Sequence, residues 1–313
     1  MNDTRSAIID ALADGPVSGP ALADRLDVSR NAVWKHVEAL REAGFEVESS
    51  EAGYRLADVP DYGGPAVEYG LEAPFSVEYH DAIGSTNDRA RELAAEGATD
   101  VAVLADEQTG GRGRLDRKWE GPSGGVWVSL LVRPDVPPAH APLLTLAAAV
   151  AVTRAAREAG VDAEIKWPND VVVADESTER GGRKLTGILT EMEGEADRVS
   201  WTVVGIGVNA NVPSERLPAD ATSVQAEVSP VDRRAFVQRL LETFDELRAD
   251  PDAILPAWRE YAATLGQQVR VETPDGTVEG EAVDVAVPGA LVVDTDDGRV
   301  RVHAGDCDHL RPA

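Results

Sequence analysis

The spacing of apolar residues changes character along the chain, and each change limits what that segment can fold into. Helical spacing runs through the first 43 residues, alternation follows to residue 56, and short alternating segments return after Gly266. Apolar residues three to four apart predict amphipathic helices, whereas strict alternation predicts half-buried strands. No internal repeat relates these segments, so we expect the 313 residues to form several different domains.

The first 60 residues have the layout of a winged helix-turn-helix. Helices are expected over 4–13, 20–26 and 29–43, with Ser29 as the N-cap of the third, and a strand hairpin over 45–56. Val33, Val37 and Leu40 form one apolar stripe on the third helix. This helix would be the recognition helix, and the candidate DNA contacts on its other face are Arg30, Asn31, Lys35 and His36.

The charge of this segment leaves DNA binding open. Residues 1–60 carry six cations and 11 anions, whereas free DNA-binding domains are usually basic. Many small helical bundles share the same layout. The cations nevertheless gather on or near the third helix, so operator binding remains a hypothesis beside the predicted fold.

Composition divides the rest of the chain. Residues 61–74 lie in a stretch that is rich in proline and glycine and lacks periodicity, as expected of a linker. Strands and helices mix over 75–265, and short strands separated by PDG, PG and DDG turns occupy 266–313, the pattern of a small β-barrel. We therefore predict three domains, over 1–60, 75–265 and 266–313.

Charge and cysteine content indicate where the protein works. The formal net charge is −26, and only four of the 30 cationic residues are lysines. Carboxylates stay hydrated when ions screen them, so an acidic, lysine-poor surface suits a salt-rich cytoplasm; codon bias would explain the arginines but not the excess of acid. A single cysteine, Cys307, fits a reducing cytosol. We expect a halophilic, cytoplasmic protein.

Nothing in the sequence predicts a membrane segment. The longest apolar run, 143–153, is about half of the ~20 residues that a membrane-spanning helix needs. The N-terminal residues lack the basic flank and apolar core of a signal peptide. We expect no membrane partner.

The segment DEQTGGRGRLDRKW, residues 106–119, stands out in this acidic chain because it combines three glycines with four cations. Glycines allow close approach of the backbone to a ligand, and arginines match phosphate or carboxylate oxygens. The segment is neither a P-loop nor a Rossmann fingerprint, and an RNA-binding Gly/Arg segment would need repetition. We expect a loop that is mobile when empty and orders around an anion.

Four further segments combine polar residues with predicted buried strands or a helix start: 84–88 (GSTND), 166–170 (KWPND), 183–191 (RKLTGILTE) and 203–211 (VVGIGVNAN). Two of these segments have a structural alternative. Ser85 or Thr86 would serve only as a helix N-cap. Lys166 would pair with Asp170, because a charge beside a buried strand is costly unless it is paired or binds a ligand.

These motifs occur in the order and spacing of the biotin protein ligases, which the chain resembles over nearly its whole length. The two terminal domains resemble those of the bifunctional class that also represses biotin genes. The implied fold class is multidomain α+β: an N-terminal winged helix-turn-helix, a central biotin/lipoate-ligase-like α+β catalytic domain and a C-terminal SH3-like β-barrel. The related lipoate ligases share the catalytic fold but not the GRGR–RKW pair.

The resemblance implies an ATP-dependent biotin–protein ligase, which forms biotinyl-5′-AMP and then transfers biotin to a lysine of a biotin carboxyl carrier domain. The positions implied to bind biotin are Ser85, Thr86, Asn87, Gln108, Arg112, Gly113, Arg114 and Lys184. The positions implied to bind the nucleotide are Arg117, Lys118, Trp119, Lys166, Asn169 and Asn209. The residues expected to act in catalysis are Arg114, Lys184 and Asp170, the last as the base for the accepting lysine.

Some expectations have explicit alternatives. Trp127 either walls the ligand pocket or packs in the core. Mg²⁺ is expected as the counter-ion of ATP, although the sequence has no metal-ligand motif of its own. The implied partners are the carrier protein, operator DNA and a second copy of the chain when the adenylate is bound. The main rival is a ligand-sensing transcription regulator without catalysis, and a third interpretation gives the winged helix a purely structural role.

Overall fold

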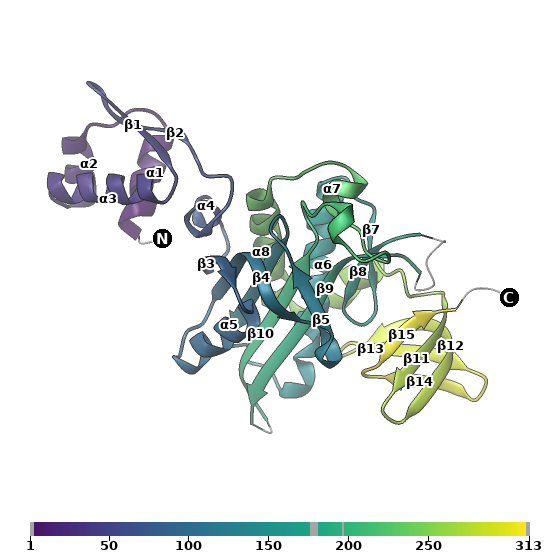
Figure 1. Cartoon of the computed structure of the whole chain (residues 1–313). Coiled ribbons are helices and arrows are strands. Elements are labelled where there is room, and N and C mark those ends of the chain that lie inside the picture. The colour runs from purple at the N-terminus through teal and green to yellow at the C-terminus, as the bar shows by residue number, and fades with distance from the viewer. Residues whose placement is uncertain (1–2, 176–180, 196, 311–313) are drawn as a thin grey trace. The chain divides into compact units, whose positions relative to one another are not determined.

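A computed structural model describes residues 3–175, 181–195 and 197–310 (Figure 1). The chain divides into two compact units, Met1–Glu72 and Ala73–Ala313. Each unit is described by itself.

The N-terminal unit is the predicted winged helix-turn-helix. Its elements are α1 (Asp3–Ala13), α2 (Gly19–Leu26), α3 (Arg30–Glu42), β1 (Glu46–Ser50) and β2 (Gly53–Asp58). Ser29 caps α3, since its Oγ accepts the Ala32 N–H at 3.1 Å. Val33, Val37 and Leu40 are fully buried, so the predicted stripe is the core face of α3.

The segment expected as a linker is partly folded against this unit. It contains the short helix α4 (Gly64–Glu68), with Pro65 in its first turn and Val67 buried. Tyr69 then packs edge-on against Phe45, with ring centroids 6.3 Å apart. Too few residues are involved for periodicity to reveal this helix.

A mixed sheet of eight strands forms the centre of the second unit. Along its main path the order is β3-β4-β6-β10-β9-β8-β7, and β5 pairs with β4. Only β3 and β4 run parallel among the described pairs. The strands are β3 (Ser76–Ile83), β4 (Val101–Arg112), β5 (Lys118–Gly121), β6 (Val126–Val132), β7 (Ala163–Lys166), β8 (Asp170–Val173), β9 (Arg183–Gly194) and β10 (Val199–Val208).

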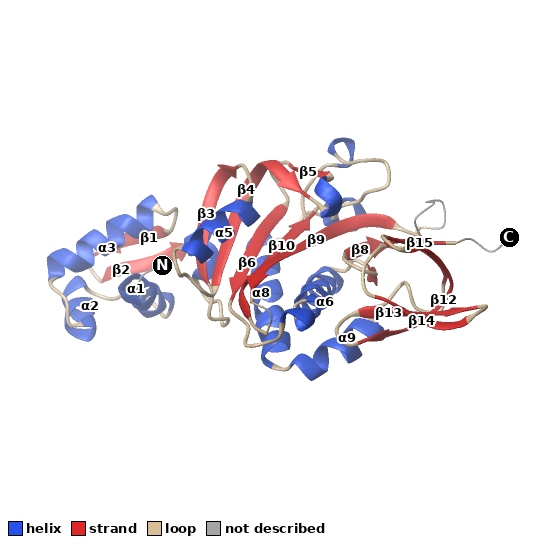
Figure 2. Cartoon of the chain, turned by 90° about the horizontal axis from the view of Figure 1, so that it is seen from below, coloured by secondary structure: helices blue, strands red, loops and turns tan. Residues whose placement is uncertain are grey.

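Helices cover both faces of this sheet (Figure 2). Neighbouring residues on β9 point to opposite faces: Glu191 reaches Asn87 on one face, and Thr190 contacts Thr145 on the other. The helix α5 (Thr86–Ala95) therefore lies opposite α6 (Pro142–Glu158), which packs with α8 (Arg233–Ala249) and α9 (Ile254–Glu260). The remaining elements are α7 (Val224–Glu227) and the 3₁₀ turns η1 (Arg114–Asp116), η2 (Pro138–His140), η3 (Ser214–Arg216) and η4 (Pro251–Ala253).

The stretch Pro138–Glu158, which includes α6, has the length and apolarity of a membrane span. However, 72% of its most apolar window is buried within the protein. Its contacts are with the sheet, α8 and α9, as expected of the core helix of a soluble domain.

The C-terminal residues form a five-stranded antiparallel sheet in the order β14-β13-β12-β11-β15. It belongs to the same compact unit as the large sheet. The Trp167 indole N–H, just after β7, donates to Gly289 O in the turn before β13 at 2.9 Å and so links the two sheets. The topology of the five-stranded sheet agrees with the SH3-like expectation. The strands are β11 (Gln268–Thr273), β12 (Gly276–Ala286), β13 (Ala290–Thr295), β14 (Gly298–Val302) and β15 (Asp306–His309).

Candidate functional site

A cavity of about 450 Å³ opens on the face of the large sheet that carries α5. This volume is in the range of small-molecule sites. Its walls come from the start of α5, the segment 112–120, the strands β8–β10 and the C-terminal strand β15. Residues far apart in the sequence therefore share one pocket.

The glycine-rich segment is more ordered than the sequence indicates. Gln108–Arg112 belong to β4 and pair with β5, so this half is not the mobile loop that we expected. The turn that follows is closed by Gly113 N–H, which donates to Arg117 O at 2.7 Å. The antiparallel strand β5 supplies hydrogen bonds that composition alone does not predict.

One part of the cavity is lined by the uncharged residues Thr86, Asn87 and Gln108. The fully buried Ser129 does not line the cavity but contacts two of them, and we call these four residues the neutral cluster. Gln108 Oε1 accepts from the N–H of Thr86 at 2.7 Å and from its hydroxyl at 2.9 Å. Ser129 Oγ lies 2.7 Å from Thr86 Oγ1 and 2.6 Å from Asn87 Oδ1. Buried polar groups that satisfy one another in this way are held in defined positions.

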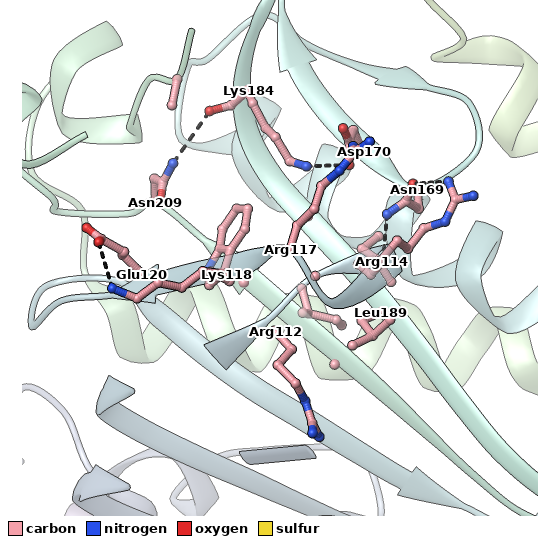
Figure 3. Close-up of a pocket in the computed structure, with 18 of the residues that line it drawn as sticks. Arg112, Arg114, Arg117, Lys118, Glu120, Asn169, Asp170, Lys184, Leu189 and Asn209 are labelled. Atoms are coloured by element: carbon pink, nitrogen blue, oxygen red, sulfur yellow. Dashed lines mark hydrogen bonds and ion pairs between the residues drawn. The ribbon is translucent and has the colours of Figure 1, made fainter. Parts of the chain in front are cut away.

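The other part carries charge, and we call Arg114, Arg117, Asp170, Lys184 and Asp306 the charged cluster. Lys184 Nζ lies 2.8 Å from Asp170 Oδ1, and Arg117 pairs with Asp306. Arg114 lies 3.8 Å from Asp306. Figure 3 shows the Lys184–Asp170 pair. Their side chains are one quarter to three fifths exposed, so an anion from solvent can compete for the three cations.

Arg114 is also held by uncharged groups. It donates to Asn169 Oδ1 at 3.1 Å and to Gly305 O at 3.0 Å. Asn169 is oriented in turn, because its Nδ2 donates to Ile188 O at 2.8 Å. Contacts from β15 and from the β7–β8 turn thus fix this guanidinium at the cavity wall.

The ring of Trp119 lies over Gly187 of β9 and Gly207 of β10, in the wall of the cavity. A Cβ on Gly207 would come within 2.7 Å of the Trp119 indole nitrogen, so only glycine leaves room for the ring. Lys184 Nζ is 5.3 Å from the ring centroid, a cation–π contact. The indole N–H is buried and has no hydrogen-bond partner among the described residues, which leaves a donor for a ligand.

Nearly all of the predicted ligand residues line this cavity, but two of their side chains do not point into it. Arg112 pairs with Asp88 at 2.5 Å and is directed away from the Lys184–Asp170 pair (Figure 3). Lys118 is 73% exposed and pairs with Glu120. The predicted residues that line the cavity are Ser85, Thr86, Asn87, Gln108, Arg112, Gly113, Arg114, Arg117, Lys118, Trp119, Lys166, Asn169, Asp170, Lys184 and Asn209.

Trp127 is the exception: it is fully buried and does not line the cavity. Its indole N–H donates to Asp106 O at 3.1 Å and to Pro122 O at 3.0 Å. The ring packs edge-on against Trp119, which separates it from the ligand space. Of the two roles expected for Trp127, the structure has core packing.

Some of the predicted site residues also form hydrogen bonds or ion pairs within the protein. Asn209 Nδ2 donates to Thr222 O at 3.0 Å, and its backbone N–H donates to Leu185 O at 3.0 Å. Lys166 is only 6% exposed. Asp170, the candidate base, is paired with Lys184, so its carboxylate would have to leave that lysine before it could accept a proton.

Sequence reasoning missed several residues that line the cavity, including Asp306 and Cys307, and one that contacts its lining, Ser129. Ser129 interrupts the apolar strand VWVSLLV, and that pattern was a usable signal. No pattern in the sequence indicated Asp306 and Cys307 of the C-terminal sheet. Burial raises the pKa of the Cys307 thiol to about 12, and burial beside Lys166 lowers the pKa of His309 to about 4. Both groups are therefore uncharged near neutral pH.

The candidate DNA residues lie on α3 of the other unit. Arg30, Asn31 and Lys35 are exposed, and His36 is half-buried. Trp34, which the sequence did not single out, is 51% exposed on the same helix. This helix thus presents cationic, polar and aromatic side chains to solvent.

Comparison with known families matches all three parts of the chain. Residues 80–209 match the biotin/lipoate A/B protein ligase family, and residues 264–310 match the biotin protein ligase C-terminal domain. Residues 4–55 match a helix-turn-helix domain.

Curated relatives and solved structures agree with these matches. The chain is 39% identical to the bifunctional ligase/repressor BirA of Bacillus subtilis over 93% of both chains. It is 35% identical to the biotin–[acetyl-CoA-carboxylase] ligase of Mycobacterium tuberculosis over 73% of this chain and 86% of that one. The fold is similar to the Aquifex aeolicus biotin protein ligase solved with biotin and ATP, with a TM-score of 0.62, 23% identity and coverage of 75% of this chain and 99% of that one.

Proposed function

The chain belongs to the family of bifunctional biotin protein ligase/repressors, and from this premise we propose that it is an ATP-dependent biotin–protein ligase that also regulates transcription. In the first step, biotin and ATP give biotinyl-5′-AMP and pyrophosphate. In the second, a lysine of a biotin carboxyl carrier domain displaces AMP and forms an amide. The observation that supports this proposal is a single cavity lined by Thr86, Asn87 and Gln108 of the neutral cluster and by the whole charged cluster.

The charged cluster suits the first step. A carboxylate must approach the α-phosphate of ATP, and both groups are anionic. Arg114 and Lys184 offset this repulsion and stabilise the charge that develops as pyrophosphate leaves. Asp170 and Asp306 pair with these cations until the anionic ligand takes the place of the two carboxylates.

The neutral cluster suits the ring of biotin. The urea group of biotin offers two N–H donors and one carbonyl acceptor, and Thr86, Asn87 and Gln108 can form hydrogen bonds with them. The buried network of these residues favours one arrangement of donors and acceptors, and a ligand that cannot match it leaves polar groups unpaired.

The second step requires an uncharged lysine from the carrier. We propose that Asp170 accepts its proton after the adenylate has drawn Lys184 away from the carboxylate. Lys184 would then face the adenylate phosphate. No covalent enzyme intermediate is needed.

Other features follow from the same function. Mg²⁺ would enter with the ATP phosphates, since the carboxylates of the charged cluster already have cationic partners. We propose a cytoplasmic protein that works at high ionic strength, given its net charge of −26. We also propose that adenylate binding favours a homodimer.

For the regulatory role, we propose that α3 contacts operator DNA through Arg30, Asn31, Lys35 and His36. The Lys35→Glu variant should ligate normally but lose any operator mobility shift. If the wild-type protein gives no shift in any ligand state, the winged helix has a structural role only.

The ligase is tested by pyrophosphate release with ATP and biotin in molar salt, with and without a carrier domain. We expect a single turnover without carrier, because the adenylate stays bound, and continuous turnover with it. Saturable biotin binding without pyrophosphate release would instead support a ligand-sensing regulator.

A further inference from the structure

A chain of ionic and hydrogen-bonded contacts runs outside the cavity and ends on the amide of Asn87. Asn87 Nδ2 donates to Glu191 Oε2 at 2.7 Å. Glu191 Oε1 accepts from Arg91 at 3.2 Å, and Arg91 also pairs with Asp88. Asp88 in turn holds Arg112 of the glycine-rich segment at 2.5 Å. Neither Glu191 nor Arg91 lines the cavity.

This arrangement determines which end of the Asn87 amide faces which partner. A carboxylate only accepts hydrogen bonds, so the amide nitrogen must be the end that faces Glu191. The oxygen then faces Ser129 Oγ, 2.6 Å away. A Cβ on Gly205 would collide with this oxygen, so the amide is packed closely against the strand β10.

We propose that Glu191 is a positioning residue for biotin: it fixes the amide of Asn87 so that the oxygen is presented as an acceptor for a urea N–H. This inference rests on the proposed ligase function. With the opposite amide orientation, two N–H donors would face each other and binding would weaken. Arg91 supports the arrangement by holding the second oxygen of Glu191.

The role of Arg91 makes the proposal testable by a pair of substitutions. In Glu191→Gln, one side-chain end is an oxygen and the other an NH₂ group. Asn87 and Arg91 both require an acceptor, so one of them loses its partner. Replacing Arg91 by Met removes this competition, and the glutamine oxygen is then free to accept from Asn87.

The experiment compares KM for biotin and for ATP in pyrophosphate release by the full chain, with Glu193→Gln as the matched control on the same strand. Glu191→Gln should raise the KM for biotin about tenfold and change the KM for ATP less than about twofold. In the Arg91→Met background, Glu191→Gln should raise the KM for biotin by less than about threefold. The difference between its effects in the two backgrounds is the coupling of the two residues, which a double-mutant cycle measures.

Two results would overturn the proposal: an unchanged KM for biotin in Glu191→Gln, or equal increases of both KM values, which would indicate general distortion. If even the wild-type protein releases no pyrophosphate, the ligase function fails separately. Calorimetric titration with biotin would then still decide whether Glu191 controls biotin affinity, with the same expected ratio between variants.

Discussion

The neutral and the charged cluster share one cavity but are stabilised in different ways. In the neutral cluster, the side-chain oxygens of Thr86, Asn87 and Gln108 and the amide nitrogen of Asn87 have partners within the protein, and all of these residues except Gln108 are buried. In the charged cluster, the three cations form ion pairs with two carboxylates and remain partly exposed.

The difference reflects the chemistry expected of each part. A network of uncharged groups has one low-energy arrangement and can therefore select one ligand. Ion pairs near solvent contribute little stability, so they can exchange a carboxylate for a phosphate at small cost. We therefore expect the neutral cluster to provide specificity and the charged cluster to provide charge stabilisation.

Removing a cation should have the largest effect. We expect Arg114→Ala to reduce the rate of adenylate formation by about 100- to 1000-fold, because a positioned donor to developing charge is lost. The measurement is single-turnover pyrophosphate release. Ligand-free DNA binding should not change, and Arg299→Ala, on the exposed strand β14, is the matched control. Unaltered transfer in Arg114→Ala would contradict the assignment of the site.

A change in the neutral cluster should affect one substrate. Thr86→Val keeps the shape but removes the hydroxyl that donates to Gln108, so the KM for biotin should rise about tenfold. The KM for ATP should stay constant, and Thr86→Ser should retain most of the affinity. Equal changes in both KM values would mean that the two clusters are not functionally distinct.

Salt should distinguish the clusters without mutation. Screening weakens exposed charge interactions more than buried hydrogen bonds, so the Kd for ATP should rise about fivefold between about 0.1 and 1 M KCl. The Kd for biotinol, which lacks the carboxylate, should change less than about twofold over the same range. Calorimetry measures both. Parallel salt dependence of the two ligands would contradict the comparison.

The smallest effect concerns stability near the charged cluster. In the folded protein the pKa of His309 is about 4, below its ordinary value of 6.5. Between pH 6.5 and about pH 4 the imidazole is therefore protonated in the unfolded chain but not in the folded protein. Stability is therefore lost as the pH falls from 6.5. His309→Asn should reduce this loss by about 1 kcal/mol between about pH 6.5 and 5, measured by urea unfolding. Identical pH profiles for the two proteins would contradict the lowered pKa.

Sequence reasoning found most of the candidate site because its motifs resemble those of the biotin protein ligases, and some of their residues are also unusual in their local context. Arg114 and Lys184 are cations in a chain that is otherwise acidic, and Thr86 lies at a predicted helix start. The structure places these three residues in the lining of one cavity. Trp127 shows the limit, because an aromatic residue on a strand gives no sign of which face it occupies.

The order of the domains, the core face of α3 and the residue types of the ligand-binding motifs were determined by the sequence alone. Such features depend on periodicity, turn chemistry and charge within short windows. Only the tertiary structure decided that Glu191 orients Asn87, or that Asp306 holds Arg117. These contacts join residues about one hundred or more positions apart, through strand order and register. Local patterns do not encode that register, because it is selected by the packing of the whole sheet.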